Sequence, residues 1–327
     1  MSQNTKSRGI KLLTLILPAI WLTGCVEYTI ESTVNPDGSG IRVEQMDVSA
    51  QDEVEVSPDD FPSLMHAGEE DGWGHTEEVD DDGDTYHRFQ RRTVVDDLAS
   101  WSDLNDRVRI SGAILDKAGS QIGYITLGEV RFRNTVHVRR ASDSDGDISF
   151  TYRETFTWEK AVDALAEFFM AELEETFVAR YPRLSSEEVG QVVGFARARF
   201  WVAVDEGLLS GDGDEDQLMS EVAHRTAQQA LNIVRLHYPE ERSESVTDLL
   251  LGILVESDDR LVAFLENELP GLNIALNSEI IFRLNMPGRV TDSNAHERDG
   301  TTLVWEFGPG DALHTPVEIF AESVVGG

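Results

Sequence analysis

Apolar residues at every second position mark β-strands at both ends of this chain. From Tyr28 to Val34 apolar and polar residues alternate, and the sequence NPDGSG from Asn35 to Gly40 predicts a turn because proline and glycine set its backbone. In the strand that follows, the apolar positions slip by one between Val43 and Met46. Such a slip predicts a β-bulge, which inserts one extra residue into a strand.

The clearest hairpin runs from Glu129 to Trp158, where apolar residues alternate with polar ones on both arms. The two apolar sets share a face only if paired residue numbers sum to an even value. A three-residue loop from Ser144 to Gly146 meets this condition and places glycine last, where a left-handed backbone is needed. The pattern therefore predicts both the pairing and its register.

From Glu159 to Leu269 the apolar period changes to that of helices, and four helices are predicted. The first ends at Pro182, and the sequence SSEE from Ser185 to Glu188 is a capping-box start for the second. The third ends at Pro239. The fourth carries the run Leu249–Val255, which is apolar on nearly all sides, so we expect that helix to be central and buried.

Strand patterns return after the helices, and the order strands, helices, strands predicts an α+β fold. We expect an antiparallel β domain formed by the N- and C-terminal segments, with a helical bundle inserted between them. The predicted parts are a signal peptide over 1–24, the first part of the β domain over 25–158, the inserted bundle over 159–269 and the second part of the β domain over 270–327.

The start of the chain has the pattern of a secretory leader. Its first eleven residues carry three basic residues and no acid, and Leu12–Leu22 is apolar but shorter than the roughly 20 residues of a spanning helix. The sequence LTGC, Leu22–Cys25, resembles the lipobox of bacterial lipoproteins. That resemblance implies cleavage between Gly24 and Cys25 and a lipid on the Cys25 thiol; Val26 in place of an aspartate favours the outer over the inner membrane. The alternative is an ordinary signal peptide with a cysteine at its end.

Two further segments extend this resemblance. The early strand pair around DGSG, Asp37–Gly40, and the late sequence LNMPGRVTDSNAHERDGTTLVWEF, Leu284–Phe307, are similar to the β-rich domain of bacterial LppM-type lipoproteins. The resemblance covers the two ends of the chain and not the helices. It implies a β-rich envelope domain, and it offers no catalytic residues to carry over.

Charge and cysteine content exclude several classes of function. The chain holds 27 Lys+Arg against 61 Asp+Glu, a formal net charge of −34, which repels nucleic acid and predicts no such partner. Its single cysteine is the one in the lipobox, which leaves no thiol for a disulfide, a zinc–thiolate site or thiol catalysis.

Motifs for metal binding are incomplete. Glu221 and His224 form one E-x-x-H on a helix, but carboxylate-bridged metal bundles need two. Asp143, Asp145 and Asp147 have the early spacing of a calcium loop, yet the glycine stands at the wrong position, so a turn is favoured. We therefore predict no metal, no cofactor and no enzymatic activity; the rival hypothesis is a hydrolase or metal-dependent enzyme built from scattered acids and histidines.

One basic surface stands out from the acidic background. Five residues are predicted to share the polar face of the central hairpin: Arg131, Arg133, His137, Arg139 and Arg153. A second basic cluster, His87–Arg92, lies on a neighbouring strand. Arginine forms paired hydrogen bonds to phosphate and carboxylate, so this face is a candidate site for an anionic lipid headgroup or acidic glycan. The alternative is that local acids pair with these arginines.

These features together predict a lipid-anchored bacterial envelope protein with a non-catalytic binding or scaffolding role. Its expected partners are the membrane, through the N-terminal lipid, and an anionic lipid, a glycan or other envelope proteins. A second alternative is a lipid carrier, which requires the sheet to curl around an apolar cavity.

The lipid anchor is tested by Cys25→Ala. Because the thiol is the attachment point, this variant should incorporate no fatty acid when a bacterial host is grown with an alkyne-labelled palmitate. Val26→Ala, a change at the next residue, should be labelled like the wild type. Normal labelling of Cys25→Ala would sink the lipoprotein hypothesis.

Overall fold

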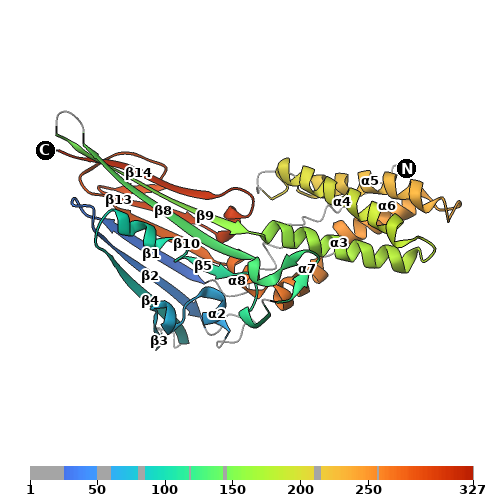
Figure 1. Ribbon diagram of the computed structural model, residues 1–327, viewed down its shortest axis with the longest axis horizontal. Coiled ribbons are helices and arrows are strands. Elements are labelled where there is room, and N and C mark those ends of the chain that lie inside the picture. The colour runs from blue at the N-terminus through green and yellow to red at the C-terminus, as the bar shows by residue number, and fades with distance from the viewer. Residues whose placement is uncertain are drawn as a thin grey trace, which may run out of the picture. The chain divides into compact units, whose positions relative to one another are not determined.

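The computed structural model describes residues 26–49, 60–79, 85–117, 119–142, 146–209, 215–255 and 258–326. The predicted signal peptide, its cleavage site at Gly24 and the lipidation site Cys25 lie outside these residues. The chain forms two compact units (Figure 1). The β unit contains the described residues within 22–120, 126–161 and 265–327, and the helical unit those within 121–125 and 162–264.

Strands from both ends of the chain combine in the two main sheets of the β unit, which confirms the α+β class. Among the described residues, the first sheet has the order β12 (Glu297–Asp299), β13 (Thr302–Phe307), β10 (Glu279–Asn285), β1 (Glu27–Val34), β2 (Gly40–Ser49), β4 (Thr85–Val95) and β3 (Gly74–Val79). The second has the order β11 (Arg289–Ser293), β14 (Val317–Val325), β9 (Ile148–Glu159), β8 (Arg131–Ser142) and β5 (Arg109–Ser111). β6 (Gln121–Ile122) and β7 (Ile125–Thr126) form a small pair.

The first sheet is mixed, whereas an antiparallel sheet was expected. β1 from the N-terminal segment runs parallel to β10 from the C-terminal segment. A parallel pair needs a long connection, and the chain between these two strands provides one. The residue boundaries predicted between the β domain and the bundle stay predictions.

The predicted β-bulge in β2 is wrong. β1 and β2 pair without a shift from Glu27 opposite Asp47 to Val34 opposite Gly40. The apolar pattern slips because β2 turns two charged residues inward: Arg42 and Glu44 are fully buried, in phase with Met46. Other buried groups balance the charges of Arg42 and Glu44. β2 therefore keeps its regular pairing, with no inserted residue.

The predicted register of the central hairpin is confirmed. β8 and β9 pair from Arg131 opposite Glu159 to Ser142 opposite Ile148, so every pair sums to an even number, and Gly146 has a φ of +89°. The buried face of this hairpin packs against the first sheet. The ring of Phe156 lies 6.1 Å from that of Phe282 and 5.0 Å from that of Phe307. An aromatic layer therefore joins the two sheets at this point.

The helices follow the predicted order, except that two helices, α6 (Ser243–Leu254) and α7 (Asp258–Glu268), stand where a single fourth helix was expected and that α6 is less buried than expected. The other longer ones are α3 (Ala161–Arg180), α4 (Ser186–Asp205) and α5 (Glu215–Val234). The capping box forms at α4, where the Ser185 hydroxyl accepts a hydrogen bond from the Glu188 amide at 3.3 Å. α6 was expected to be buried on nearly all sides, but Leu249 and Leu251 are half-buried while Leu250 and Leu254 are enclosed. It is an amphipathic helix.

Short helices lie along the β unit and complete its core. They are α2 (Phe61–Met65) and α8 (Pro270–Leu276), together with 3-10 turns at Glu69–Asp71, Ala99–Leu104, Leu115–Lys117, Leu127–Glu129 and Pro309–Ala312. α8 approaches the end of β5 so closely that a Cβ on Gly271 would lie 1.7 Å from the Ser111 carbonyl oxygen. No helix among the described residues combines the length and the apolar character that crossing a membrane requires.

Candidate functional site

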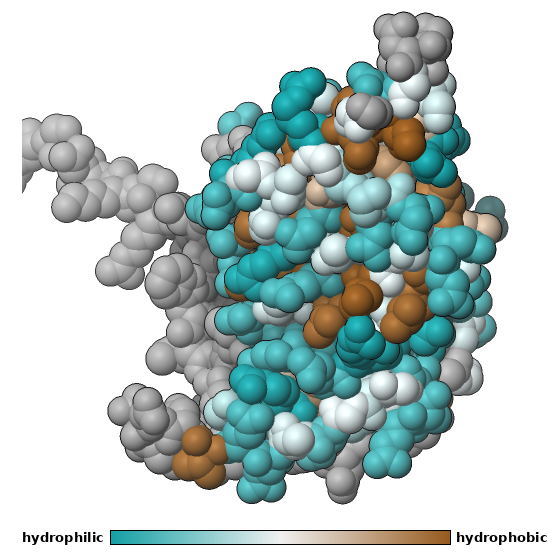
Figure 2. Space-filling model, turned by 90° about the vertical axis from the view of Figure 1, so that its left-hand side faces the viewer, coloured by the Kyte–Doolittle hydropathy of each residue, from teal (hydrophilic) through white to brown (hydrophobic). Residues whose placement is uncertain are grey.

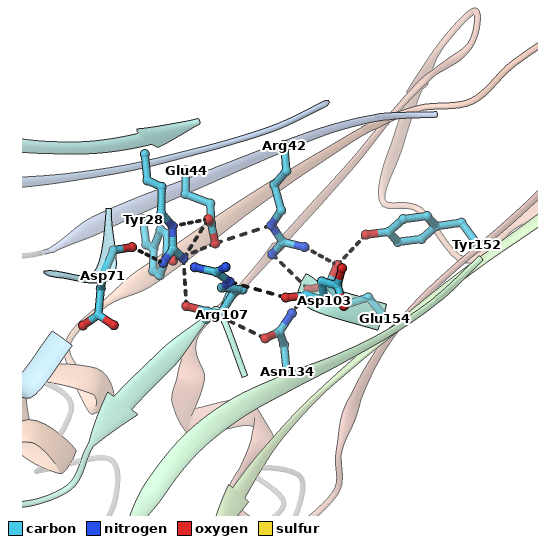
Figure 3. Close-up of polar contacts among 11 residues, drawn as sticks. Tyr28, Arg42, Glu44, Asp71, Asp103, Arg107, Asn134, Tyr152 and Glu154 are labelled. Carbon is cyan, nitrogen blue, oxygen red and sulfur yellow. Dashed lines mark hydrogen bonds and ion pairs between the residues drawn. The ribbon is translucent and has the colours of Figure 1, made fainter. Parts of the chain in front are cut away.

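A buried ion pair joins the two main sheets of the β unit (Figure 3). Arg42 on β2 donates to Glu154 on β9 through both terminal nitrogens, with Nη1–Oε2 at 2.9 Å and Nη2–Oε1 at 3.0 Å. Both side chains are fully buried. Two parallel, charge-assisted bonds are the strongest geometry available to this pair of groups.

A second pair extends this cluster along the first sheet. Arg91 on β4 donates from Nε to Glu44 Oε2 at 2.8 Å, and its other nitrogens donate to the Asp71 carbonyl at 3.1 Å and the Arg107 carbonyl at 2.9 Å. The guanidinium also lies 4.6 Å from the ring centroid of Trp73. Arg42 Nε is 3.4 Å from Glu44 Oε1, so charges of opposite sign alternate through the cluster.

Neutral side chains donate further hydrogen bonds to the carboxylates of Glu44 and Glu154. Tyr28 donates to Glu44 Oε1 at 3.3 Å, and Tyr152 donates to Glu154 Oε2 at 2.5 Å. Asn134 Nδ2 donates to Glu154 Oε1 at 2.5 Å. Glu154 is therefore met by donors from both sheets and Glu44 by donors from the first sheet, so each buried charge has the partners it requires.

Burial and neighbouring charges together shift the pKa values of two tyrosines and Arg42 in this cluster. Desolvation raises the pKa of Tyr28 and of Tyr152 well above the ordinary value, and the neighbouring carboxylates raise it further. Both phenols therefore stay neutral donors. Desolvation lowers the pKa of Arg42, but the attraction of Glu154 and Glu44 outweighs it, so the net shift is upward and Arg42 stays charged.

This cluster, the buried charge cluster (Tyr28, Arg42, Glu44, Arg91, Asn134, Tyr152 and Glu154), suits a structural role. Its members are all nearly or fully buried, and their polar groups are directed at one another (Figure 3). Catalytic groups must touch a substrate, which these side chains do not face. The cluster clamps the two sheets together and specifies their alignment.

Removing Arg42 tests this role. Arg42→Met leaves Glu154 without its counter-ion and should lower the free energy of unfolding by about 3–5 kcal/mol, measured by urea denaturation. Arg42→Met combined with Glu154→Gln removes both charges and should cost less than Arg42→Met alone. Arg225→Met breaks the exposed pair with Glu221 and should cost less than about 1 kcal/mol. A loss below that value in Arg42→Met contradicts the clamp.

A second cluster brings together a serine, a histidine and an aspartate beside the first. His66 follows α2, and its Nε2 lies 2.8 Å from Ser111 Oγ. Its Nδ1 lies 4.0 Å from Asp71 Oδ2. In a serine hydrolase these three groups would be nucleophile, base and orienting acid.

The hydrogen bonds of His66 do not suit that chemistry. Arg109 Nη2 lies 2.6 Å from His66 Nδ1, and a guanidinium can only donate, so Nδ1 is an acceptor. The neutral ring then carries its proton on Nε2, facing Ser111. A general base needs a free lone pair on that nitrogen. Desolvation and, next, the charge of Arg109 lower the pKa of His66 to about 4, which keeps the ring neutral.

This lowered pKa makes stability depend on pH. At pH values between about 6.5 and about 4, His66 is protonated in the unfolded chain but stays neutral in the folded chain. The free energy of unfolding should therefore fall as the pH falls through this window, by at most about 1.4 kcal/mol per pH unit and less with solvent screening.

His66→Gln keeps a polar group beside Ser111 and should flatten this pH dependence, measured by urea denaturation at several pH values. His314→Gln, a change at an exposed histidine, should leave the slope as in the wild type. Parallel curves for wild type and His66→Gln would show that His66 does not titrate in this way.

The basic surface of the hairpin contains several arginines that are paired with acids. Arg131 Nε lies 2.5 Å from Glu159, Arg133 Nε lies 3.0 Å from the same carboxylate, and Arg153 Nη1 lies 3.0 Å from Glu318. The other two members, His137 and Arg139, are exposed. Among the described residues no carboxylate lies within 4.0 Å of either.

The second basic cluster is divided between two environments. Arg88 pairs with Asp47 at 2.8 Å on one face of β4, whereas Arg91 belongs to the buried charge cluster. The E-x-x-H residues are also engaged elsewhere: Glu221 pairs with Arg225, and His224 Nδ1 lies 2.6 Å from the Ser220 carbonyl.

The surface view adds the character of one face. On the face shown in Figure 2, hydrophilic residues surround separate small groups of hydrophobic ones.

The aspartates of the predicted calcium-like turn, Asp143 and Asp145, lie outside the described residues. In the part of the chain that the structure describes, no group of three or more His, Cys, Asp or Glu side chains is arranged to hold a metal ion.

No protein family model matches the chain, and no curated protein matches it. The folded domain of LppM from Mycobacterium tuberculosis, solved by NMR, is similar over 93% of this chain and 93% of that one, with 10% sequence identity and a TM-score of 0.28.

Proposed function

We propose that this chain is a lipid-anchored bacterial envelope protein that binds or scaffolds other envelope components and is not an enzyme. The leader and the lipobox at Leu22–Cys25 support the anchor, and Val26 supports the outer membrane over the inner. The labelling of Cys25 described above tests this part of the proposal.

The main support for a non-catalytic role is that the charged groups of the buried charge cluster, and His66 with Ser111, form hydrogen bonds with one another. The buried charge cluster is enclosed between two sheets, and His66 presents a proton, not a lone pair, to Ser111. Both clusters hold the β unit together. A rigid two-sheet unit of this kind is suited to present a fixed outer surface to a partner.

The outer face of β8 is the proposed binding surface. His137 and Arg139 are exposed and lie on the same face of the strand, and Arg153 lies directly opposite His137 on β9. Exposed cationic groups in one row suit an anionic lipid headgroup, an acidic glycan or an acidic protein surface. Arg131 and Arg133 lie in the same row and are already paired, so the proposal rests on the end of the row at Arg139, which has no ion pair with any residue that the structure describes.

Charge reversal tests this surface. Arg139→Glu should weaken sedimentation of the purified protein with phosphatidylglycerol vesicles, because each lost contact from arginine to phosphate costs about 1.5–3 kcal/mol. Arg180→Glu makes the same change at an exposed arginine of α3, outside both basic clusters, and should bind as the wild type does. Vesicles of phosphatidylcholine alone measure the contribution of the lipid anchor.

Acidic oligosaccharides in the same assay distinguish a glycan from a lipid ligand. If Arg139→Glu binds every anionic lipid and glycan as tightly as Arg180→Glu does, the hairpin face is an ordinary solvated surface. Loss of folding is monitored by circular dichroism on both variants.

A further inference from the structure

Two histidines meet at the edge of the seven-stranded sheet. His75 on β3 and His87 on β4 are brought together by the pairing of these strands, and His75 Nε2 lies 3.0 Å from His87 Nδ1. His75 is exposed and His87 is half-buried, so solvent reaches the pair. One ring donates a hydrogen bond to the other in this arrangement.

The surroundings hold the pair in place on one side. The ring of His75 stacks on Phe89 with centroids 4.6 Å apart and an interplanar angle of 11°. Phe61 of α2 lies against the same phenyl ring at 5.3 Å. Glu77 is directly opposite His87 on β3, and side chains of directly opposed residues lie on the same face of a sheet.

We propose that His75 and His87 form a binding site for a divalent transition-metal ion, Cu²⁺ or Ni²⁺. On binding, the ring that donates the hydrogen bond would carry its proton on its other nitrogen, so that both facing nitrogens offer a lone pair to the metal. Water would fill the remaining positions of the metal. Imidazole nitrogen is a preferred ligand of these ions. Glu77 adds negative charge on the same face, and the net charge of −34 on the whole chain attracts dications.

The nitrogens are close enough to bind one ion after a small turn of the rings. With metal–nitrogen bonds of about 2.05 Å, two ligands at a right angle lie about 2.9 Å apart, and the hydrogen-bonded nitrogens lie 3.0 Å apart. The choice of metal rests on the ligand type, because nitrogen ligands bind Cu²⁺ more tightly than Zn²⁺ and suit the tetragonal sites of Cu²⁺ and Ni²⁺.

Metal binding also requires a change in ring orientation. The ring centroids are 5.2 Å apart, so the rings point at each other along the line of the hydrogen bond. For both lone pairs to meet at one ion beside that line, each ring must turn within its plane. The exposure of His75 leaves room for this turn, and its stacking on Phe89 is preserved by an in-plane rotation.

Copper binding to the purified full-length protein tests the site. Titration with CuCl₂ in the presence of a competing chelator should show one tight site, whose electron paramagnetic resonance spectrum has splitting from two imidazole nitrogens. His75→Ala and His87→Ala each reduce two linked ligands to one and should weaken that site on the order of 100-fold. His314→Ala removes an exposed histidine elsewhere in the β unit and should bind as the wild type does.

His75→Gln and His87→Gln, which keep a polar side chain of similar length, should lose the site as the alanine variants do. They cover the case in which loss of the His75 stacking on Phe89 unfolds the alanine variant. Equal copper affinity in the wild type and in the folded variants overturns the proposal. So does a spectrum without coordinated imidazole at the tight site.

Discussion

The ion pair between Arg42 and Glu154 is the interaction on which the β unit depends. It joins strands that lie 112 residues apart in sequence and belong to different sheets. Moving β2 by one residue against its neighbours would turn Arg42 to solvent and leave Glu154 as an unpaired buried charge, which is strongly unfavourable. The pair therefore fixes the register of β2 in addition to holding the two sheets together. Apolar residues in the same places would hold the sheets together without this selectivity.

The same cluster also positions the irregular segments beside the sheets. Arg91 donates to the carbonyl groups of Asp71 and Arg107, and these segments flank His66 and Arg109. The core charges and the His66 cluster are thus linked through short loops. Gly271 adds to this order, because α8 packs directly on the Ser111 backbone at a position where a Cβ would collide. A β unit ordered to this degree is suited to present surfaces that keep their shape.

Local pattern was sufficient for some elements and not for others. The hairpin register could be predicted because both β8 and β9 alternate cleanly, and the capping box of α4 because SSEE is a local signal. The inward charges of β2 defeated the same reasoning, since alternation assigns Arg42 and Glu44 to solvent. The apolar composition of α6 predicts a helix buried on nearly all sides. The half-buried Leu249 and Leu251 show that apolar content alone does not place a helix in the core.

The sites depend on partners that sequence does not bring together. His75 and His87 have no recognisable spacing, and they meet because β3 and β4 pair with a particular register. The acids that pair with Arg131, Arg133 and Arg153 come from three different segments, so the sequence left open whether that face is paired or available. Cys25 is different, because the lipobox is a local motif that needs no fold to be recognised.

Amide hydrogen exchange on Glu154→Gln tests most directly whether this ion pair makes the two sheets one cooperative unit. The matched reference is the wild type under the same native conditions. If the pair couples the sheets, protection should fall by the same free energy in β2 and β4 of one sheet and in β8 and β9 of the other. A fall confined to β9 and its immediate neighbours, with β2 and β4 protected as in the wild type, would contradict the account.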